Sequence, residues 1–127
     1  VYGGMLSNNQ IIEYEQKVHL LINPRPTKYK YTEYSFPSKL MEYMQSGTPV
    51  LTTRLAGISE DYFDKMYFID DETPNGMKDA IEFCLAKSDE ELSDKGKIAR
   101  SYVIKTKNCV EQMNRVFKEI EDTLFVY

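Results

Sequence analysis

The residues best suited to chemistry stand close together near the middle of the chain: Pro37, Ser38, Lys39 and Glu42. Pro37 fits the first turn of a helix, because a backbone N–H group at that position would have no helical partner. The free N–H groups of such a turn and the positive end of the helix dipole suit an anionic group such as a diphosphate. Glu42 would lie on the polar side of the same helix, where its carboxylate can accept hydrogen bonds from the vicinal hydroxyls of a ribose. A phosphate ligand at this helix end is therefore physically reasonable.

Each of these side chains also has a plain structural interpretation. Glu42 could be a solvated glutamate that pairs with Lys39 at the i,i+3 spacing of a helix. Lys39 could contact a phosphate, or it could be an exposed lysine in an ion pair. The spacing alone leaves both interpretations open.

Residues 24–36 come before this helix and are typical of a long irregular loop, because they combine prolines, lysines and tyrosines. Long loops in compact domains are usually functional or mobile. Arg25 is a second candidate for a phosphate contact, with fixation of the loop as the alternative. The tyrosines, Tyr34 among them, could stack on a base or a sugar, whereas ordinary packing is the simpler role for aromatic side chains.

The elements that must position these residues alternate between strands and helices. Short apolar runs predict strands at residues 18–22, 50–53 and 66–69, and residues 1–2 are interpreted as the end of an earlier strand. Asn8 or Asn9 is expected to cap a short helix that runs to Lys17. Helical spacing predicts further helices at 37–46, near 60–64, and within 77–85, 92–102 and 110–124. Ser88 and Glu91 form a capping box at the start of one of them. The alternation predicts an α/β fold, a Rossmann-like parallel sheet with flanking helices and a helical C-terminus.

In an open parallel sheet, ligands bind in the crevice beyond the carboxyl ends of the strands. In this chain, the loops after Asn23, Thr53 and Asp70 would form that crevice. Gly57, past the end of the second of these strands, could allow close approach of the backbone to a ligand or could simply make a turn. The crevice is therefore the expected site, with the loop at 24–38 as its main part.

Composition indicates one globular domain and argues against several partners. The chain has 127 residues, of which 42% are hydrophobic, and this is enough to form a core. A net charge of -4 gives no electrostatic footprint for nucleic acid. No apolar run approaches the roughly 18 residues that a membrane span needs. The cysteines lack metal-ligand spacing, which argues against a metal site at these residues. We also expect no cofactor besides a substrate.

Cys84, Cys109 and His19 are expected to have structural roles. The two cysteines fall within predicted helices, which favours buried, reduced thiols and therefore a cytoplasmic location. His19 falls within an apolar strand, where a histidine is usually hydrogen-bonded and not catalytic.

The stretch of residues 34–50, YSFPSKLMEYMQSGTPV, resembles the signature region of bacterial group 1 glycosyltransferases, the retaining family 4. In those enzymes, a helix with a Glu-x-x-x-x-Gly-x-Pro-Val pattern carries a glutamate that holds the ribose of the nucleotide sugar. Glu42 matches that glutamate. Residues 20–25 and 56–60 look like the strand–loop units that flank the signature, so the resemblance extends over most of the chain.

The chain departs from the family pattern at a second glutamate, which normally stands eight positions earlier and contacts the donor sugar. That position is Tyr34, and Glu33 is one residue away. Residues 36–39, Phe-Pro-Ser-Lys, resemble subfamilies that make bacterial surface polysaccharides. The sugar contact could come from backbone N–H groups of residues 34–38, which adds Ser35 and Phe36 to the candidate donor-binding residues. The family's basic pair for the diphosphate has no match here, and Lys39 and Arg25 are the candidate substitutes.

The resemblance implies a hexosyltransferase-like enzyme that transfers a sugar, with retention, from a nucleoside diphosphate sugar to a saccharide or lipid-linked glycan. Residues 1–127 would form a single, truncated donor-binding domain of the GT-B fold, inactive without its acceptor domain. The full enzyme would be cytoplasmic or peripheral to the inner face of the membrane. An unpaired sheet edge would favour self-association of the fragment. The alternative is a non-catalytic α/β binding module of the same fold.

Overall fold

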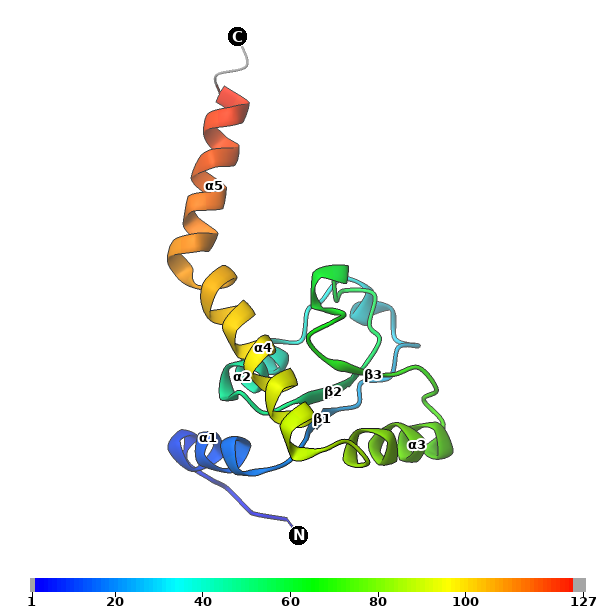
Figure 1. The fold of residues 1–127 in the computed structure, drawn as a ribbon. Helices are drawn as coiled ribbons and strands as arrows, with labels where there is room; N and C mark the ends of the chain where they lie inside the picture. The colour runs from blue at the N-terminus through cyan, green and yellow to red at the C-terminus, as the bar shows by residue number, and fades with distance from the viewer. Residues whose placement is uncertain (1, 125–127) are drawn as a thin grey trace.

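The computed structural model describes residues 2–124, which form a three-stranded parallel sheet and five α-helices (Figure 1). The strands are β1 (Leu21–Asn23), β2 (Val50–Thr53) and β3 (Tyr67–Ile69). The helices are α1 (Asn8–Lys17), α2 (Ser38–Ser46), α3 (Pro74–Leu85), α4 (Asp89–Thr106) and α5 (Cys109–Leu124). Two short 3-10 helices, η1 (Lys30–Glu33) and η2 (Glu60–Tyr62), lie in the connecting loops. The α/β class predicted from the sequence is confirmed.

Strand β2 is the centre of the sheet, with β1 and β3 on either side. All four of its residues are buried, as expected for a parallel strand covered on both faces. Successive side chains point to opposite faces, so Val50 packs in a core with residues of α2 and α4, while Leu51 packs in a second core with Cys84 of α3. The helices on the two faces therefore enclose β2 between them.

Helix α2 is held firmly in this arrangement. Leu40 and Met44, four residues apart, are fully buried. The helix ends at Gly47, whose φ of 81° is in the left-handed region that favours glycine. Helix α4 passes so close to this end that a Cβ on Gly96 would lie 1.9 Å from the Gly47 carbonyl oxygen. The position of α2 is thus fixed by the sheet, its own cap and α4.

Helix α5 differs from the other helices. It continues outward from the end of α4 and projects away from the sheet (Figure 1). Of its residues Cys109 to Thr123, every one is exposed. Its apolar side chains therefore have no cover from the described part of the chain.

Several boundaries differ from the sequence-based predictions. The first predicted strand, 18–22, is wrong in extent, since β1 begins at Leu21. An almost unbroken apolar run is typical of a parallel strand covered on both faces. Instead, β1 is an edge strand with an exposed Ile22. Tyr2 lies outside any strand, and residue 1 is outside the described residues. The strand at 50–53 is confirmed.

The helix caps give a mixed result. The capping box of Ser88 and Glu91 is confirmed. Helix α1, however, is capped by Ser7, which forms a capping box with Gln10, and the prediction of Asn8 or Asn9 is wrong. Both asparagines lie within the helix, because the Ser7 hydroxyl accepts the Gln10 N–H and the Gln10 side chain accepts the Ser7 N–H, one residue before Asn8.

The predictions for the histidine and for one cysteine are also wrong. His19 is exposed and precedes β1, because the strand starts three residues later than the apolar run suggests. Cys84 is buried and Cys109 is exposed at the start of α5. Both cysteines are free thiols. Burial by helical spacing fails at Cys109 because α5 projects away from the sheet and its side chains stay exposed from Cys109 to Thr123.

Candidate functional site

The carboxyl ends of the three parallel strands meet at one edge of the sheet, and the loop at 24–37 is tied to that edge. The hydroxyl of Thr53, the last residue of β2, accepts a hydrogen bond from the Arg25 backbone N–H at 3.1 Å and donates one to the Arg25 carbonyl at 2.5 Å. Further along, the N–H of Thr27 donates to the Glu72 carboxylate at 3.1 Å. Arg25 is therefore fixed through its backbone while its side chain remains exposed.

The loop then passes directly under the segment that follows β2. A Cβ placed on Gly57 would lie 2.5 Å from the carbonyl oxygen of Ser35, which no side chain could tolerate. Gly57 thus allows one loop to approach another, and it shapes the site through the backbone of Ser35. The Ser35 hydroxyl donates to the Tyr31 carbonyl at 3.1 Å.

Phe36 and Pro37 anchor the start of α2 in the core. The Phe36 ring packs on Tyr62, with ring centroids 4.9 Å apart, and Pro37 is buried. Pro37 occupies the N-cap position, one residue before the first turn that the sequence suggested, and no side chain caps the helix. The backbone N–H groups of Ser38 and Lys39 therefore have no side-chain capping acceptor, which leaves the positive end of α2 available to an anion.

Lys39 and Glu42 lie next to each other on α2 and share a third partner from α1. The Lys39 ammonium is 2.6 Å from Glu42 Oε1 and 3.3 Å from Oε1 of the buried Glu15. The hydrogen bond from Lys39 is the main cause that lowers the pKa of Glu42, and the same bond raises the pKa of Lys39. Glu42 is therefore held as a carboxylate, and its side chain remains 42% exposed.

This charged group borders a hollow between α1 and α2. The hollow has a volume of about 280 Å³ and is lined by Asn8, Ile11, Ile12, Lys39 and Glu42. It combines two aliphatic side chains with a carboxylate and an ammonium group. An apolar wall with a few polar groups is the usual lining of a small-molecule site.

Tyr34 and Glu33 lie apart from the Lys39–Glu42 pair. Tyr34 is 84% exposed, and Glu33 is exposed at the end of η1. The structure records no contact between either side chain and Lys39 or Glu42. The sequence-predicted residues thus divide into a group at α2 that the fold brings together and a pair of loop side chains that stand apart.

Two features of this region were missed by the sequence analysis. Glu15 is one, and its only sequence signal is a glutamate in a helix that must pack against α2. Arg54, directly after β2, is the other, and its guanidinium Nε lies 2.7 Å from Asp70 Oδ1. The same guanidinium is 4.2 Å from the Phe68 ring centroid, so Arg54 links the ends of β2 and β3. A basic residue immediately after a central strand is the signal that could have revealed it.

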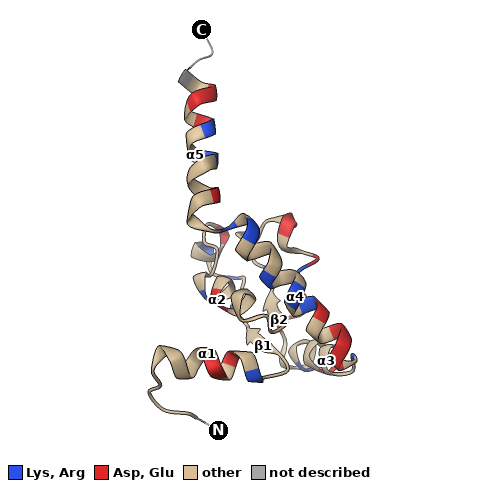
Figure 2. Ribbon diagram, turned by 60° about the vertical axis from the view of Figure 1, so that its left-hand side comes forward, with Lys and Arg blue, Asp and Glu red and all other residues tan. Residues whose placement is uncertain are grey.

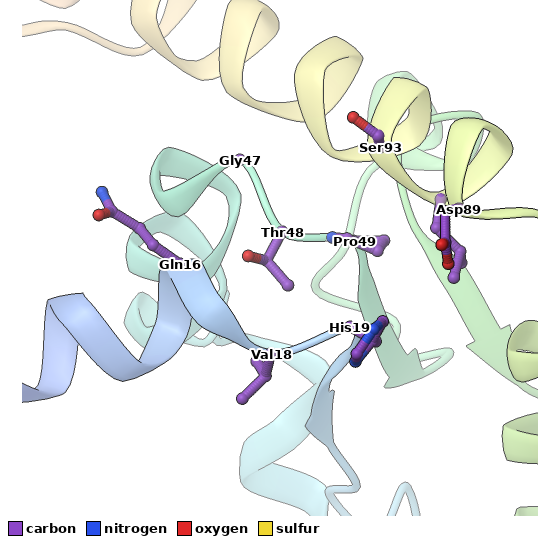
Figure 3. Close-up of a pocket in the computed structure, with 9 residues that line it drawn as sticks. Gln16, Val18, His19, Gly47, Thr48, Pro49, Asp89 and Ser93 are labelled. Atoms are coloured by element: carbon purple, nitrogen blue, oxygen red, sulfur yellow. The ribbon is translucent and has the colours of Figure 1, made fainter.

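A second hollow, of about 200 Å³, lies at the opposite, amino end of the sheet (Figure 3). His19 and Thr48 border it just before β1 and β2, and Asp89 and Ser93 of α4 close another side. The hollow beside Lys39 and Glu42 is lined by α1 and α2 and by none of the loops after the strands, so it lies outside the crevice that the sequence predicted. The hollow at the amino end contains none of the sequence-predicted donor-binding residues and lies at the end of a parallel sheet where ligands are seldom bound, so it is the weaker candidate.

Charge is distributed without a dominant basic surface. In Figure 2 the acidic first turn of α4 is followed by lysine and arginine positions along the same helix. Among the described residues, no group of three or more histidine, cysteine, aspartate or glutamate side chains is arranged to hold a metal ion. Within residues 2–124, no helix has the length and apolar character required to span a bilayer.

Comparison with known proteins identifies the family. The family model described as "Glycosyl transferases group 1" matches residues 1–87, which include the whole sheet, α2 and the hollow beside it. No curated protein and no solved structure matches the chain. Because the matched segment covers well over half of the 127 residues, the chain belongs to the group 1 glycosyltransferase family.

Proposed function

We propose that this chain binds a nucleoside diphosphate sugar, with the ribose at Glu42 and the diphosphate at the amino end of α2. The family match supports a glycosyltransferase, and members of this class use a nucleotide-sugar donor and an acceptor. The finer assignment is supported by residues 34–50, in which Glu42 stands where the family's ribose-binding glutamate is expected.

The observation that carries the proposal is the state of Glu42. Its carboxylate is ionised, half-exposed and at the edge of the 280 Å³ hollow. A carboxylate can accept about four hydrogen bonds, and Lys39 occupies only Oε1. Glu42 therefore retains acceptor capacity for two neighbouring hydroxyl groups of a ribose.

The charge of a diphosphate would be offset by groups around the same helix end. The open N–H groups of Ser38 and Lys39 and the helix dipole favour an anion there. Lys39 is half-exposed, and the Arg25 side chain is free to extend from its fixed backbone. Fixed dipoles and cations of this kind can stabilise a leaving diphosphate without a metal ion.

The proposal extends to the class of reaction. We infer retaining, hexosyltransferase-like transfer from the donor to a saccharide or lipid-linked glycan, in a cytoplasmic bacterial enzyme of the GT-B type that makes surface polysaccharide. The support is the resemblance at residues 34–50, including the Phe-Pro-Ser-Lys segment. In such an enzyme the acceptor binds to a second domain, so we expect this chain alone to bind the donor without transferring sugar.

A second candidate is a binding module that kept the fold without the chemistry. Two observations favour it: Glu42 already has Lys39 as an ion-pair partner, and Tyr34 stands in place of the second family glutamate. In that case the Lys39–Glu42 pair would serve only to join α2 to α1.

Calorimetric titration with uridine and guanosine diphosphates distinguishes the two candidates. We expect one of the nucleotides to bind the wild-type chain, and Glu42→Ala to weaken that binding at least about tenfold, because hydrogen bonds to a charged group contribute about 1.5–3 kcal/mol. Glu13→Ala is the matched control, since Glu13 is an exposed glutamate of α1 that pairs with Lys17. Equal affinity of the Glu42→Ala and wild-type chains, or no binding by either, would contradict the proposal and favour the binding module.

A further inference from the structure

Glu15 is a buried acid whose environment does not suit a free carboxylate. Only 5% of the residue is exposed, and its Oε1 has no hydrogen-bond partner. Lys39 Nζ lies 3.3 Å from that oxygen, within ion-pair range, but the ammonium directs its hydrogen bond to Glu42 at 2.6 Å. A buried charge without a hydrogen bond is costly, and protonation is the usual way in which a protein avoids that cost.

The neighbours of Glu15 explain which carboxyl group takes the proton. Burial is the largest cause that raises the pKa of Glu15, followed by the neighbouring Glu42 carboxyl group. Glu42 is half-exposed and hydrogen-bonded to Lys39, so its pKa is lowered. Glu15 and Glu42 share the single ammonium group of Lys39. Of the two carboxyl groups, the buried one of Glu15 is expected to bind a proton more readily.

We propose that Glu15 is a positioning residue for the donor site: as a neutral acid, it donates a hydrogen bond to Glu42 and keeps that carboxylate turned into the hollow between α1 and α2. This inference rests on the proposed function, because it assigns Glu15 to the ribose-binding group. The positioning residue therefore lies on α1, outside the signature segment at 34–50. The backbone of Glu15 is itself fixed, since its carbonyl accepts a hydrogen bond from the Thr48 hydroxyl at 2.5 Å.

The charged and titratable groups that face Glu15 come from two helices. Lys39, Glu42 and Tyr43 face it from α2. Arg100 of α4 lines a neighbouring hollow of about 310 Å³, separate from the 280 Å³ hollow, that Glu15 and Glu42 also line. When pH rises through the raised pKa of Glu15, its carboxyl group loses the proton. Two carboxylates then compete for Lys39, the Glu15–Glu42 hydrogen bond is lost, and nucleotide affinity should fall.

The direct test is a carbon-13 NMR titration of the glutamate carboxyl groups in the free wild-type chain. We expect Glu15 to titrate above the ordinary glutamate value of about 4.3 and Glu42 below it. This measurement needs no ligand and no variant. A Glu15 carboxyl group that titrates at or below Glu42 would overturn the inference.

Nucleotide binding by two variants supplies the second readout. Glu15→Gln keeps a neutral hydrogen-bond donor for Glu42. Its affinity for the nucleotide should therefore equal that of the wild type at a pH below the pKa of Glu15 and exceed it at a pH above that pKa. Glu15→Ala removes the donor and should weaken binding about tenfold at low pH. Circular dichroism would confirm that both variants are folded. If Glu15→Gln follows the wild-type pH profile, Glu15 has no positioning role.

The two proposals fail in different ways. If Glu42→Ala binds nucleotide as tightly as wild type, the proposed function fails whatever the titration of Glu15. If Glu42→Ala loses binding while Glu15→Gln and Glu15→Ala both behave as wild type, the donor site stands and only the role of Glu15 is lost.

Discussion

Helices α2 and α5 both carry apolar residues at helical spacing, but those of α2 are buried and those of α5 are exposed. In α2, Leu40 and Met44 are completely buried against the sheet and α4. In α5, Met113 and Phe117 are each at least half exposed, with no cover from the described chain. An apolar stripe therefore predicts which face of a helix seeks a partner, and it does not say whether the same chain provides one.

The difference also explains where chemistry can be placed. Because one face of α2 is fixed in the core, the opposite edge holds Lys39 and Glu42 at constant positions beside α1. Side chains on rigid elements are positioned more accurately than side chains on loops. Helix α5 has no such support and carries none of the candidate site residues.

The largest expected effect is the loss of stability in Met44→Ala. Truncating this buried side chain leaves a cavity, so the free energy of unfolding should fall by about 2–5 kcal/mol. Met113→Ala in α5 is the matched control and should change it by less than about 0.5 kcal/mol. Urea denaturation measures both, and equal losses would show that the contrast between the helices is wrong.

Gly96→Ala should destabilise the chain by about 1–3 kcal/mol, the usual cost of overpacking. The added methyl group would collide with the Gly47 carbonyl at the end of α2. In an unconstrained helix the same change would be stabilising, because alanine has the higher helix propensity. An unchanged or higher unfolding temperature would therefore mean that α4 does not hold α2 as described.

The polar edge of α2 should give the chain an acid-dependent stability. The pKa of Glu42 is lowered, so its contribution is present above the ordinary glutamate value and is lost as pH falls through the folded-state pKa. Since Glu42 is 42% exposed, the effect should stay below about 1 kcal/mol. In Glu42→Gln, the free energy of unfolding should therefore fall less steeply as the pH drops below about 4.3. Glu119→Gln in α5 is the control. If the free energy of unfolding of Glu42→Gln fell with pH as steeply as that of the wild type, the ionised Lys39–Glu42 pair would be contradicted.

The smallest effect is expected for Phe117→Ser. Phe117 is 57% exposed, so its replacement should alter the free energy of unfolding by less than about 0.5 kcal/mol. A thermal unfolding scan is sufficient. A loss above 1 kcal/mol would show that the α5 stripe is covered.

The sequence predicted the fold class because periodicity and caps act locally. The run at 50–53 is buried on both sides, and Ser88 and Glu91 satisfy each other within one turn. The run at 18–22 misled because β1 lies at the edge of the sheet, and edge position is a property of the whole topology. His19 was misplaced because β1 starts after it, and Cys109 was misplaced because α5 projects away from the sheet.

The candidate site was predictable only in part. The Lys39–Glu42 spacing and the open end of α2 follow from the helix itself. Glu15 lies 24 positions before Lys39, and no pattern within one element indicates that contact. Gly57 allows the Ser35 backbone to come close to it. This contact joins two loops that only the folded chain brings together.

The central claim is that the polar edge of α2 binds a nucleotide, and amide chemical-shift mapping tests it most directly. Nitrogen-15 spectra of the chain would be recorded during titration with uridine and guanosine diphosphates. The account predicts that the largest shifts fall at residues 38–42 of α2 and 8–12 of α1, around the hollow bordered by Glu42. Shifts concentrated at His19, Thr48 and Asp89, around the hollow at the amino end of the sheet, would contradict it.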